Sequence, residues 1–337
     1  ALRHAARFDE AALLAFSARR AFAALNDTLQ EAHCLRLLGH IASEKGSPRD
    51  GRHMVVEARA MMEELRDDVG RAQCDVVIGE LDYLLGQYEQ ARQCLQGAIA
   101  PFESSGDALG KGQCLILLAL IAIAQGDTIG ARKHLVEARK DFDRIGYRLG
   151  VAQSDIALAH ADHRSGELEA ARARAQNVLS AFRLLGTPRG QGGALRLMAM
   201  ASMDAGDLVE AEKRSAEALE LFLRMGDPWG IVECKLIAAQ IALVRGAPDA
   251  RERVEECDVT QVEEREPVQH WHLTHAWLAY REGSFDASVA QLEAARSAMA
   301  GGLGDHAKQL FGRLAAMRWP DELRERVRIA CDLSSLR

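Results

Sequence analysis

The sequence contains few aromatic residues and few prolines. Aromatic residues make up 5% of the 337 residues, and proline occurs 7 times. A β-sandwich favours the opposite composition, whereas the abundant Ala and Leu are strong helix formers. The composition therefore predicts helices, and its 48% hydrophobic and 27% charged residues are typical of a folded, soluble chain.

A surplus of basic residues and a long apolar run are also lacking. The net charge is −7 and no block of Lys and Arg stands out, which argues against a nucleic-acid partner. The longest apolar run extends from Cys114 to Ala124, which is short of the roughly 20 residues that span a bilayer. The sequence does not open on a signal-peptide pattern. We therefore expect that this chain binds neither nucleic acid nor a membrane.

Closely paired cysteines are lacking as well. The 7 Cys residues form no CxxC pair, and their use does not follow the disulfide frameworks of secreted domains. This favours a reducing environment, and we predict that the chain is cytoplasmic.

What the sequence does have is an internal period of 40 residues. Three series of Gly, one of Phe and one of Ala recur at this spacing. The series run from Gly46 to Gly246, Gly106 to Gly226, Gly70 to Gly230, Phe102 to Phe222 and Ala91 to Ala211. A fixed period of this length is typical of a solenoid, in which each unit packs only against its neighbours.

The period also accounts for most of the cysteines. One repeat position holds Cys in four units and Ser or Ala in the two others. These residues are Cys34, Cys74, Cys114, Ser154, Ala194 and Cys234. Because the position accepts only small side chains, we expect it to serve close helix packing rather than redox chemistry or metal binding.

Each unit predicts two antiparallel helices. In the unit 106–146, Gly106 supplies the positive φ of a helix C-terminus and Asp107 supplies an N-cap. We predict helix A over 108–125 and helix B over 128–145.

Helix B carries one apolar stripe at spacing i, i+4, i+7 and i+11. In this unit the stripe consists of Ala131, Leu135, Ala138 and Phe142. The small residues allow a close approach to helix A, and the Phe is expected to fill the gap to the next unit. Each hairpin leaves an apolar face uncovered, so the hairpins must stack.

Two further positions recur around the turn between helices A and B. Helix A has a small residue seven positions before the turn Gly, namely Gly39, Gly79, Ala119, Ala159, Ala199 and Ala239. A bulky residue follows the turn Gly by two positions, as in Tyr88, Leu168, Leu208 and Phe285.

With the small residue of helix B, these positions resemble the tetratricopeptide repeat over nearly the whole chain. The commonest form has 34 residues, and the 40-residue form is similar to arrays in bacterial signalling and regulatory proteins. The resemblance implies an all-α, right-handed superhelical solenoid of antiparallel helix hairpins. It is specific for the fold and not for the function.

The period divides the chain into five segments. We predict a partial repeat with helix B only in 1–25, six repeats of about 40 residues in 26–257, an acidic loop in 258–267, a seventh repeat in 268–300 and capping helices in 301–337. Because half a hairpin would leave an apolar face bare, we expect these residues to be part of a longer protein, with a catalytic or DNA-binding part ahead of them.

The helix A positions that line the concave face of such arrays are the candidate partner-binding site. Their mixture of adaptable Met, aromatic and hydrogen-bonding side chains suits a peptide or a helix. The candidates are His33, Arg36, His40, Gln73, Glu80, Tyr83, Gln113, Gln153, His160, His163, Arg196, Met200, Met203, Glu233, Gln240, His270, Trp277 and Tyr280.

We expect no catalytic, cofactor or metal site. Histidines lie one turn apart in two pairs, His160 with His163 and His272 with His275, but no carboxylate or Cys completes a ligand set at a fixed spacing. The sequence also offers no Ser/His/Asp or Cys/His arrangement, so an enzyme is not expected.

Two functions remain open. The first is a protein–protein interaction scaffold or regulatory module of a larger bacterial signalling protein, with a peptide or protein partner on the concave face. The alternative is a sensor of a small molecule or peptide signal that controls an N-terminal kinase, ATPase or DNA-binding effector. An extended, mixed groove favours the first, and a closed pocket with converging polar groups favours a small ligand.

Overall fold

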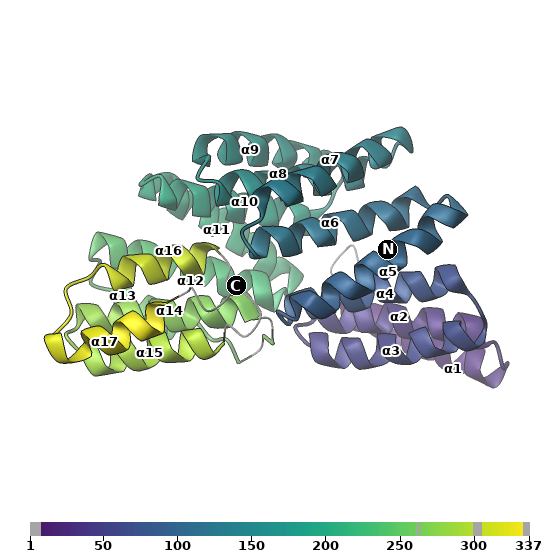
Figure 1. Ribbon diagram of the computed structural model, residues 1–337, viewed down its shortest axis with the longest axis horizontal. Coiled ribbons are helices and arrows are strands. Elements are labelled where there is room, and N and C mark those ends of the chain that lie inside the picture. Colours follow the sequence, from purple (N-terminus) through teal and green to yellow (C-terminus); the bar gives the residue numbers. More distant parts are fainter. Residues whose placement is uncertain (1–7, 261, 264, 299–304, 333–337) are drawn as a thin grey trace.

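The chain folds into a curved array of helical hairpins, seen in a computed structural model that describes residues 8–260, 262–263, 265–298 and 305–332 (Figure 1). The described residues form 17 helices and no strand. The helices are α1 (Phe8–Ala24), α2 (Thr28–Glu44), α3 (Pro48–Glu64), α4 (Asp68–Leu84), α5 (Tyr88–Ser105), α6 (Ala108–Ala124), α7 (Thr128–Arg144), α8 (Arg148–Arg164), α9 (Leu168–Leu184), α10 (Pro188–Asp204), α11 (Leu208–Met225), α12 (Pro228–Arg245), α13 (Ala250–Glu255), α14 (Arg265–Arg281), α15 (Phe285–Ser297), α16 (Asp305–Ala315) and α17 (Asp321–Cys331). The expected all-α solenoid of antiparallel hairpins is confirmed.

The contacts between helices show which side of each hairpin faces inward. Each helix A packs against its own helix B, and successive A helices from α2 to α14 also contact one another. Within the described ranges, successive B helices of the repeats make no comparable contact. The A helices therefore lie on the inner side of the curve, and we call their exposed surface the inner face.

The Phe that ends a B helix packs against a Gly of the next A helix. Phe142 on α7 is fully buried, and a Cβ atom added to Gly150 on α8 would lie 2.5 Å from its ring. The same contact joins Phe102 to Gly110, Phe182 to Gly190 and Phe222 to Gly230. Two series that look independent in the sequence are thus the two halves of one contact, repeated along the array.

The predicted helix bounds and caps hold closely in the unit 106–146. Helices α6 and α7 end one residue before the predicted ends, and Asp107 accepts a hydrogen bond of 2.9 Å from the N–H of Gly110. Thr187 also occupies an N-cap position, but its hydroxyl instead donates to the carbonyl oxygen of Phe182 at 3.3 Å.

The end of the array is less regular. Helix α13 has 6 residues, and α14 begins at Arg265, inside the stretch 258–267 that was predicted as an acidic loop. Helices α16 and α17 pack on the last hairpin through a core that includes Phe311 and Trp319. The predicted boundary between the seventh repeat and the cap, at 300–301, lies outside the described residues, as do 1–7, 261, 264, 299–304 and 333–337.

The array curls so that its first and last repeats meet (Figure 1). The backbone N–H of Arg49, at the start of α3, donates to Glu263 ahead of α14 at 3.1 Å, although the two residues are 214 positions apart. Arg189 at the start of α10 forms an ion pair with Glu44 at the end of α2. These contacts hold the first full repeat against α10 and against the segment ahead of α14.

One helix among the described residues is long and apolar enough to span a membrane. This segment, Ala108–Gln125, has a mean hydropathy of 1.7. It is longer than the uninterrupted apolar run from Cys114 to Ala124, because it also includes the residues on either side of that run. Half of it is buried inside the array, where α6 packs against α4, α5, α7 and α8. Core packing accounts for this apolar composition.

We predict that Gly150→Ala destabilises the protein and that Gly97→Ala does not. The added Cβ would collide with Phe142 and overpack the contact between hairpins, which costs about 1–3 kcal/mol. No atom lies within 4 Å of a Cβ added at Gly97 in the middle of α5, so there Ala should stabilise the helix by about 1 kcal/mol. Urea denaturation of both variants measures the difference, and equal effects would contradict the Phe–Gly contact.

Candidate functional site

The inner face carries the predicted partner-binding residues at three levels of burial. Gln113 and Gln153 are exposed. Half-buried are His33, Arg36, His40, Gln73, Glu80, Tyr83, His160, Trp277 and Tyr280. Buried are His163, Arg196, Met200, Met203, Glu233, Gln240 and His270.

Three of the buried residues form one charged network across three A helices. Nη1 of Arg196 on α10 donates to Glu233 Oε2 on α12 at 3.4 Å. Nδ1 of His270 on α14 lies 3.0 and 3.2 Å from the two carboxylate oxygens of Glu233. Each residue follows the previous one by 37 positions, so stacking of the hairpins places them side by side.

The pKa values of this network favour an ion pair. Burial alone would raise the pKa of Glu233, but the positive charges of His270 and Arg196 and the hydrogen bond with His270 outweigh it and lower that pKa. Burial alone would lower the pKa of His270, but the charge of Glu233 and their hydrogen bond raise it. A carboxylate between two cations is therefore the stable state near neutral pH.

Helices α4 and α8 bring further polar groups to the same region. Burial and the negative charge of Glu266 raise the pKa of Tyr83. The positive charges of Arg164 and Arg196 partly offset this increase. Burial, together with the positive charges of Arg196, His163 and Arg164, lowers the pKa of His160 to about 3. Near neutral pH, Tyr83 is therefore protonated and His160 is uncharged.

The first repeats contribute a second polar group. The ring nitrogens of His40 lie 3.8 Å from Glu44 and 3.8 Å from Glu80. Burial and the charge of Arg36 lower the pKa of His33. The inner face is thus polar at both ends of the curve.

Several predicted residues contact neighbouring helices rather than lying open on the inner face. Met200 and Met203 are buried in a cluster that includes Ile237. Gln240 donates to the hydroxyl of Thr274 at 3.0 Å. These side chains pack between neighbouring A helices, and their contact with a partner stays a prediction.

Trp277 and Tyr280 contact the C-terminal cap. Trp277 is partly buried against the cap core. The hydroxyl of Tyr280 donates to the carbonyl oxygen of Arg318 at 2.9 Å, and its ring lies 4.9 Å from that of Trp319. Both aromatic residues therefore help to hold the cap.

Three of the four paired histidines have partners in the fold. His163 lies 2.9 Å from Asp204, His272 lies 2.8 Å from Gln291, and His275 lies 2.9 Å from the carbonyl oxygen of Trp271. In the part of the chain that the structure describes, no group of three or more His, Cys, Asp or Glu residues is suited to hold a metal ion.

Sequence reasoning missed three residues next to the central network. Arg164 donates to the carbonyl oxygen of Ile123 at 2.7 Å. Trp229 lies under the guanidinium of Arg196. The negative charge of Glu266 helps to raise the pKa of Tyr83. None occupies a helix A position taken from the repeat pattern. Only Glu266 could have been noticed in the sequence, because it lies in the acidic stretch 258–267.

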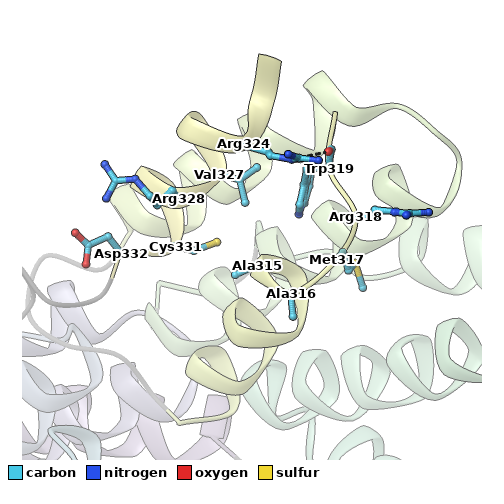
Figure 2. Close-up of a pocket in the computed structure, with 10 residues that line it drawn as sticks. All are labelled: Ala315, Ala316, Met317, Arg318, Trp319, Arg324, Val327, Arg328, Cys331 and Asp332. Carbon is cyan, nitrogen blue, oxygen red and sulfur yellow. Dashed lines mark hydrogen bonds between the residues drawn. The ribbon is translucent and has the colours of Figure 1, made fainter. Parts of the chain in front are cut away.

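Figure 2 shows a second candidate, a pocket of about 810 Å³ between the end of α16, the segment after it and α17. Arg324 donates to the carbonyl oxygen of Trp319 at 3.3 Å and pairs with Asp321 at 2.6 Å. Arg328 pairs with Glu325 at 2.7 Å. Because neighbouring acids neutralise these cations, the inner face is the stronger candidate.

No family model matches the sequence, and no curated protein sequence is similar to it. A Rap protein in complex with Competence and Sporulation Factor has a TM-score of 0.78 at 16% identity, covering 100% of this chain and 96% of that one. Aspartyl phosphate phosphatase F from Bacillus subtilis has a TM-score of 0.59 at 11% identity, covering 98% and 94%.

A third similar structure is PH0952 from Pyrococcus horikoshii, a signal transduction ATPase with numerous domains and a tetratricopeptide repeat sensor. Its TM-score is 0.54 at 14% identity, and the match covers 92% of this chain and 46% of that protein. At these identities the likeness establishes a helical repeat fold of the tetratricopeptide type.

We predict that His270→Gln lowers stability in a pH-dependent way. The pKa of His270 is raised, so its contribution is complete below its unfolded pKa near 6.5 and is lost as the pH rises through the raised value. The pKa of Glu233 is lowered from 4.5, so its contribution is lost only as the pH falls through that lower value. At about pH 6 the variant should lose about 3 kcal/mol of unfolding free energy, the cost of breaking a buried pair.

Urea denaturation at about pH 6 and about pH 9 checks this linkage. The difference between His270→Gln and the wild type should shrink at the higher pH. His53→Gln, on the exposed side of α3, is the control and should match the wild type at both pH values. A constant difference for His270→Gln would rule out the ion pair.

Proposed function

We propose that this chain is a binding module that holds a peptide or an extended protein segment on its inner face and acts within a regulatory protein. The observation that carries the proposal is the convergence of polar side chains from α4, α8, α10, α12 and α14 on one region of that face. In a solenoid the inner face is the extended surface on which partners bind.

The chemistry of this region suits a peptide. The Tyr83 hydroxyl and the guanidinium groups of Arg164 and Arg196 are donors, and the neutral ring of His160 can both donate and accept. An extended peptide exposes both backbone N–H and C=O groups, so it needs this mixture. We therefore assign the central partner contacts to these four residues.

The structural comparisons support the proposal. The similarity is greater to the Rap protein in complex with Competence and Sporulation Factor, with a TM-score of 0.78, than to the apo form of RapI, with a TM-score of 0.55. PH0952 carries a repeat of this type as a sensor in a larger signalling protein. These findings support a regulatory module that works by binding, and we infer that the chain is not itself an enzyme.

A sensor of a short signal molecule is the second candidate. The Arg49–Glu263 contact joins the first full repeat to the segment ahead of the last one, and the Arg189–Glu44 pair joins the first full repeat to the fifth. An array closed in this way favours a small or short ligand over a folded partner. Under this reading too, the ligand binds to the inner face.

Selection of short peptides from a random displayed library tests the proposal. Selected peptides should slow hydrogen exchange in α4, α8, α10 and α12. Tyr83→Ala should lower the affinity for these peptides about tenfold or more, because a hydrogen bond and an aromatic contact with the peptide are lost.

The control is Ile129→Ser, which changes a side chain 71% exposed on α7, away from the inner face. It should leave the affinity unchanged. Peptides that protect only B helices, or that bind Tyr83→Ala as well as the wild type, would contradict the inner-face assignment.

A further inference from the structure

Arg196 is a buried cation that uses only part of its hydrogen-bonding capacity. The residue is 6% exposed. Among the described residues, both hydrogen bonds of its guanidinium start from Nη1, to Glu233 at 3.4 Å and to the sulfur of Met200 at 3.5 Å. Its Nε is buried and has no hydrogen-bond partner in this part of the chain. A buried donor without a partner costs free energy, so it points to a missing acceptor.

The solenoid does not require an arginine at this position. The equivalent residues of four other repeats are apolar, namely Val76, Ile116, Ile156 and Leu236, and the first repeat has Arg36 there. An aliphatic side chain therefore meets the packing requirements of the array, and a buried charge is the more costly choice. The arginine thus serves something other than hairpin stacking.

The guanidinium is held in place before any ligand arrives. Its Cζ atom lies 4.4 Å from the ring centre of Trp229, and Glu233 holds it at Nη1. Stacking and an anchored nitrogen fix the plane of the group, so a second planar ion can bind it without a large loss of side-chain entropy.

The neighbouring groups favour an anion. Arg164 and His160 on α8 and Tyr83 on α4 lie within the electrostatic reach of Arg196. Two carboxylates are nearby. Glu233 is already hydrogen-bonded to His270, and the charge of Glu266 is felt at Tyr83, whose pKa it raises. Burial is the main cause of the lowered pKa of His160, and the positive charges of Arg196 and Arg164 lower this pKa further, as expected in a positive potential.

We propose that the Nε side of the Arg196 guanidinium binds a carboxylate of the peptide ligand, with Arg164 and Tyr83 as further donors. This inference rests on the proposed function and names the group that the inner face recognises. A carboxylate accepts two parallel N–H donors from one guanidinium in a planar fork. The carboxylate can be the C-terminus of the peptide or an Asp or Glu side chain, and the experiment separates these sources.

Three pools of short random peptides test the proposal by equilibrium dialysis and mass spectrometry. The first lacks Asp and Glu and has a free C-terminus, the second lacks Asp and Glu and is amidated, and the third is amidated and contains Glu. The amidated acid-free pool should be retained about tenfold or more weakly than a pool with the recognised carboxylate, as expected for loss of a hydrogen bond to a charged group. The pool that is retained identifies the source.

Arg196→Gln should abolish this preference, and Arg196→Lys should restore only part of it, because a lysine lacks the planar fork. The double variant Arg196→Gln/Glu233→Gln guards against misfolding caused by a glutamate left without its cation, and it should show the same loss. Arg139→Gln is the matched control, since Arg139 pairs with Asp155 at 2.9 Å and is 46% exposed. Its preference should equal that of the wild type.

Equal retention of all three pools by the wild type, or an unchanged preference in a folded Arg196→Gln variant, would overturn the carboxylate site and leave the proposed function intact. Retention of none of the pools, without any change in hydrogen exchange on the inner face, would overturn the proposed function as well.

Discussion

The contact between the Phe at the end of one B helix and the Gly near the start of the next A helix determines how the hairpins stack. Phe142 can lie against the backbone of α8 only because Gly150 has no side chain, and the arrangement recurs at three further junctions. Close packing of this kind leaves little freedom in the angle between hairpins. The curvature that brings the A helices together on one face follows from it.

That regular scaffold permits irregular chemistry on its inner face. Where the neighbouring repeats carry Ile156 and Leu236, the fifth repeat carries Arg196. The stacking of α10, α12 and α14 supplies Glu233 and His270 as its partners. A buried charge is tolerated here because a rigid scaffold holds the opposite charge in reach. The same rigidity fixes the guanidinium in advance, as the proposed carboxylate site requires.

The closure of the array connects the acidic stretch ahead of α14 with this site. Glu263 accepts a hydrogen bond from α3, and Glu266, next along the same stretch, acts on Tyr83 of α4. The segment that interrupts the repeat pattern thus lies between the first repeats and the central network. A ligand on the inner face, as proposed, would have this segment as a neighbour.

The sequence by itself determined the period, the helix bounds of the unit 106–146, the Asp caps and the two halves of the Phe–Gly contact. These features depend on residues that are near one another in the chain or repeat at a fixed spacing. It also placed Arg196, Glu233 and His270 on the inner face, but not as one network. Only the tertiary structure decided that Met200 is buried, that Arg164 and Glu266 approach Tyr83, and that Arg49 meets Glu263, because small rotations between hairpins add up over the whole array and no local pattern records their sum.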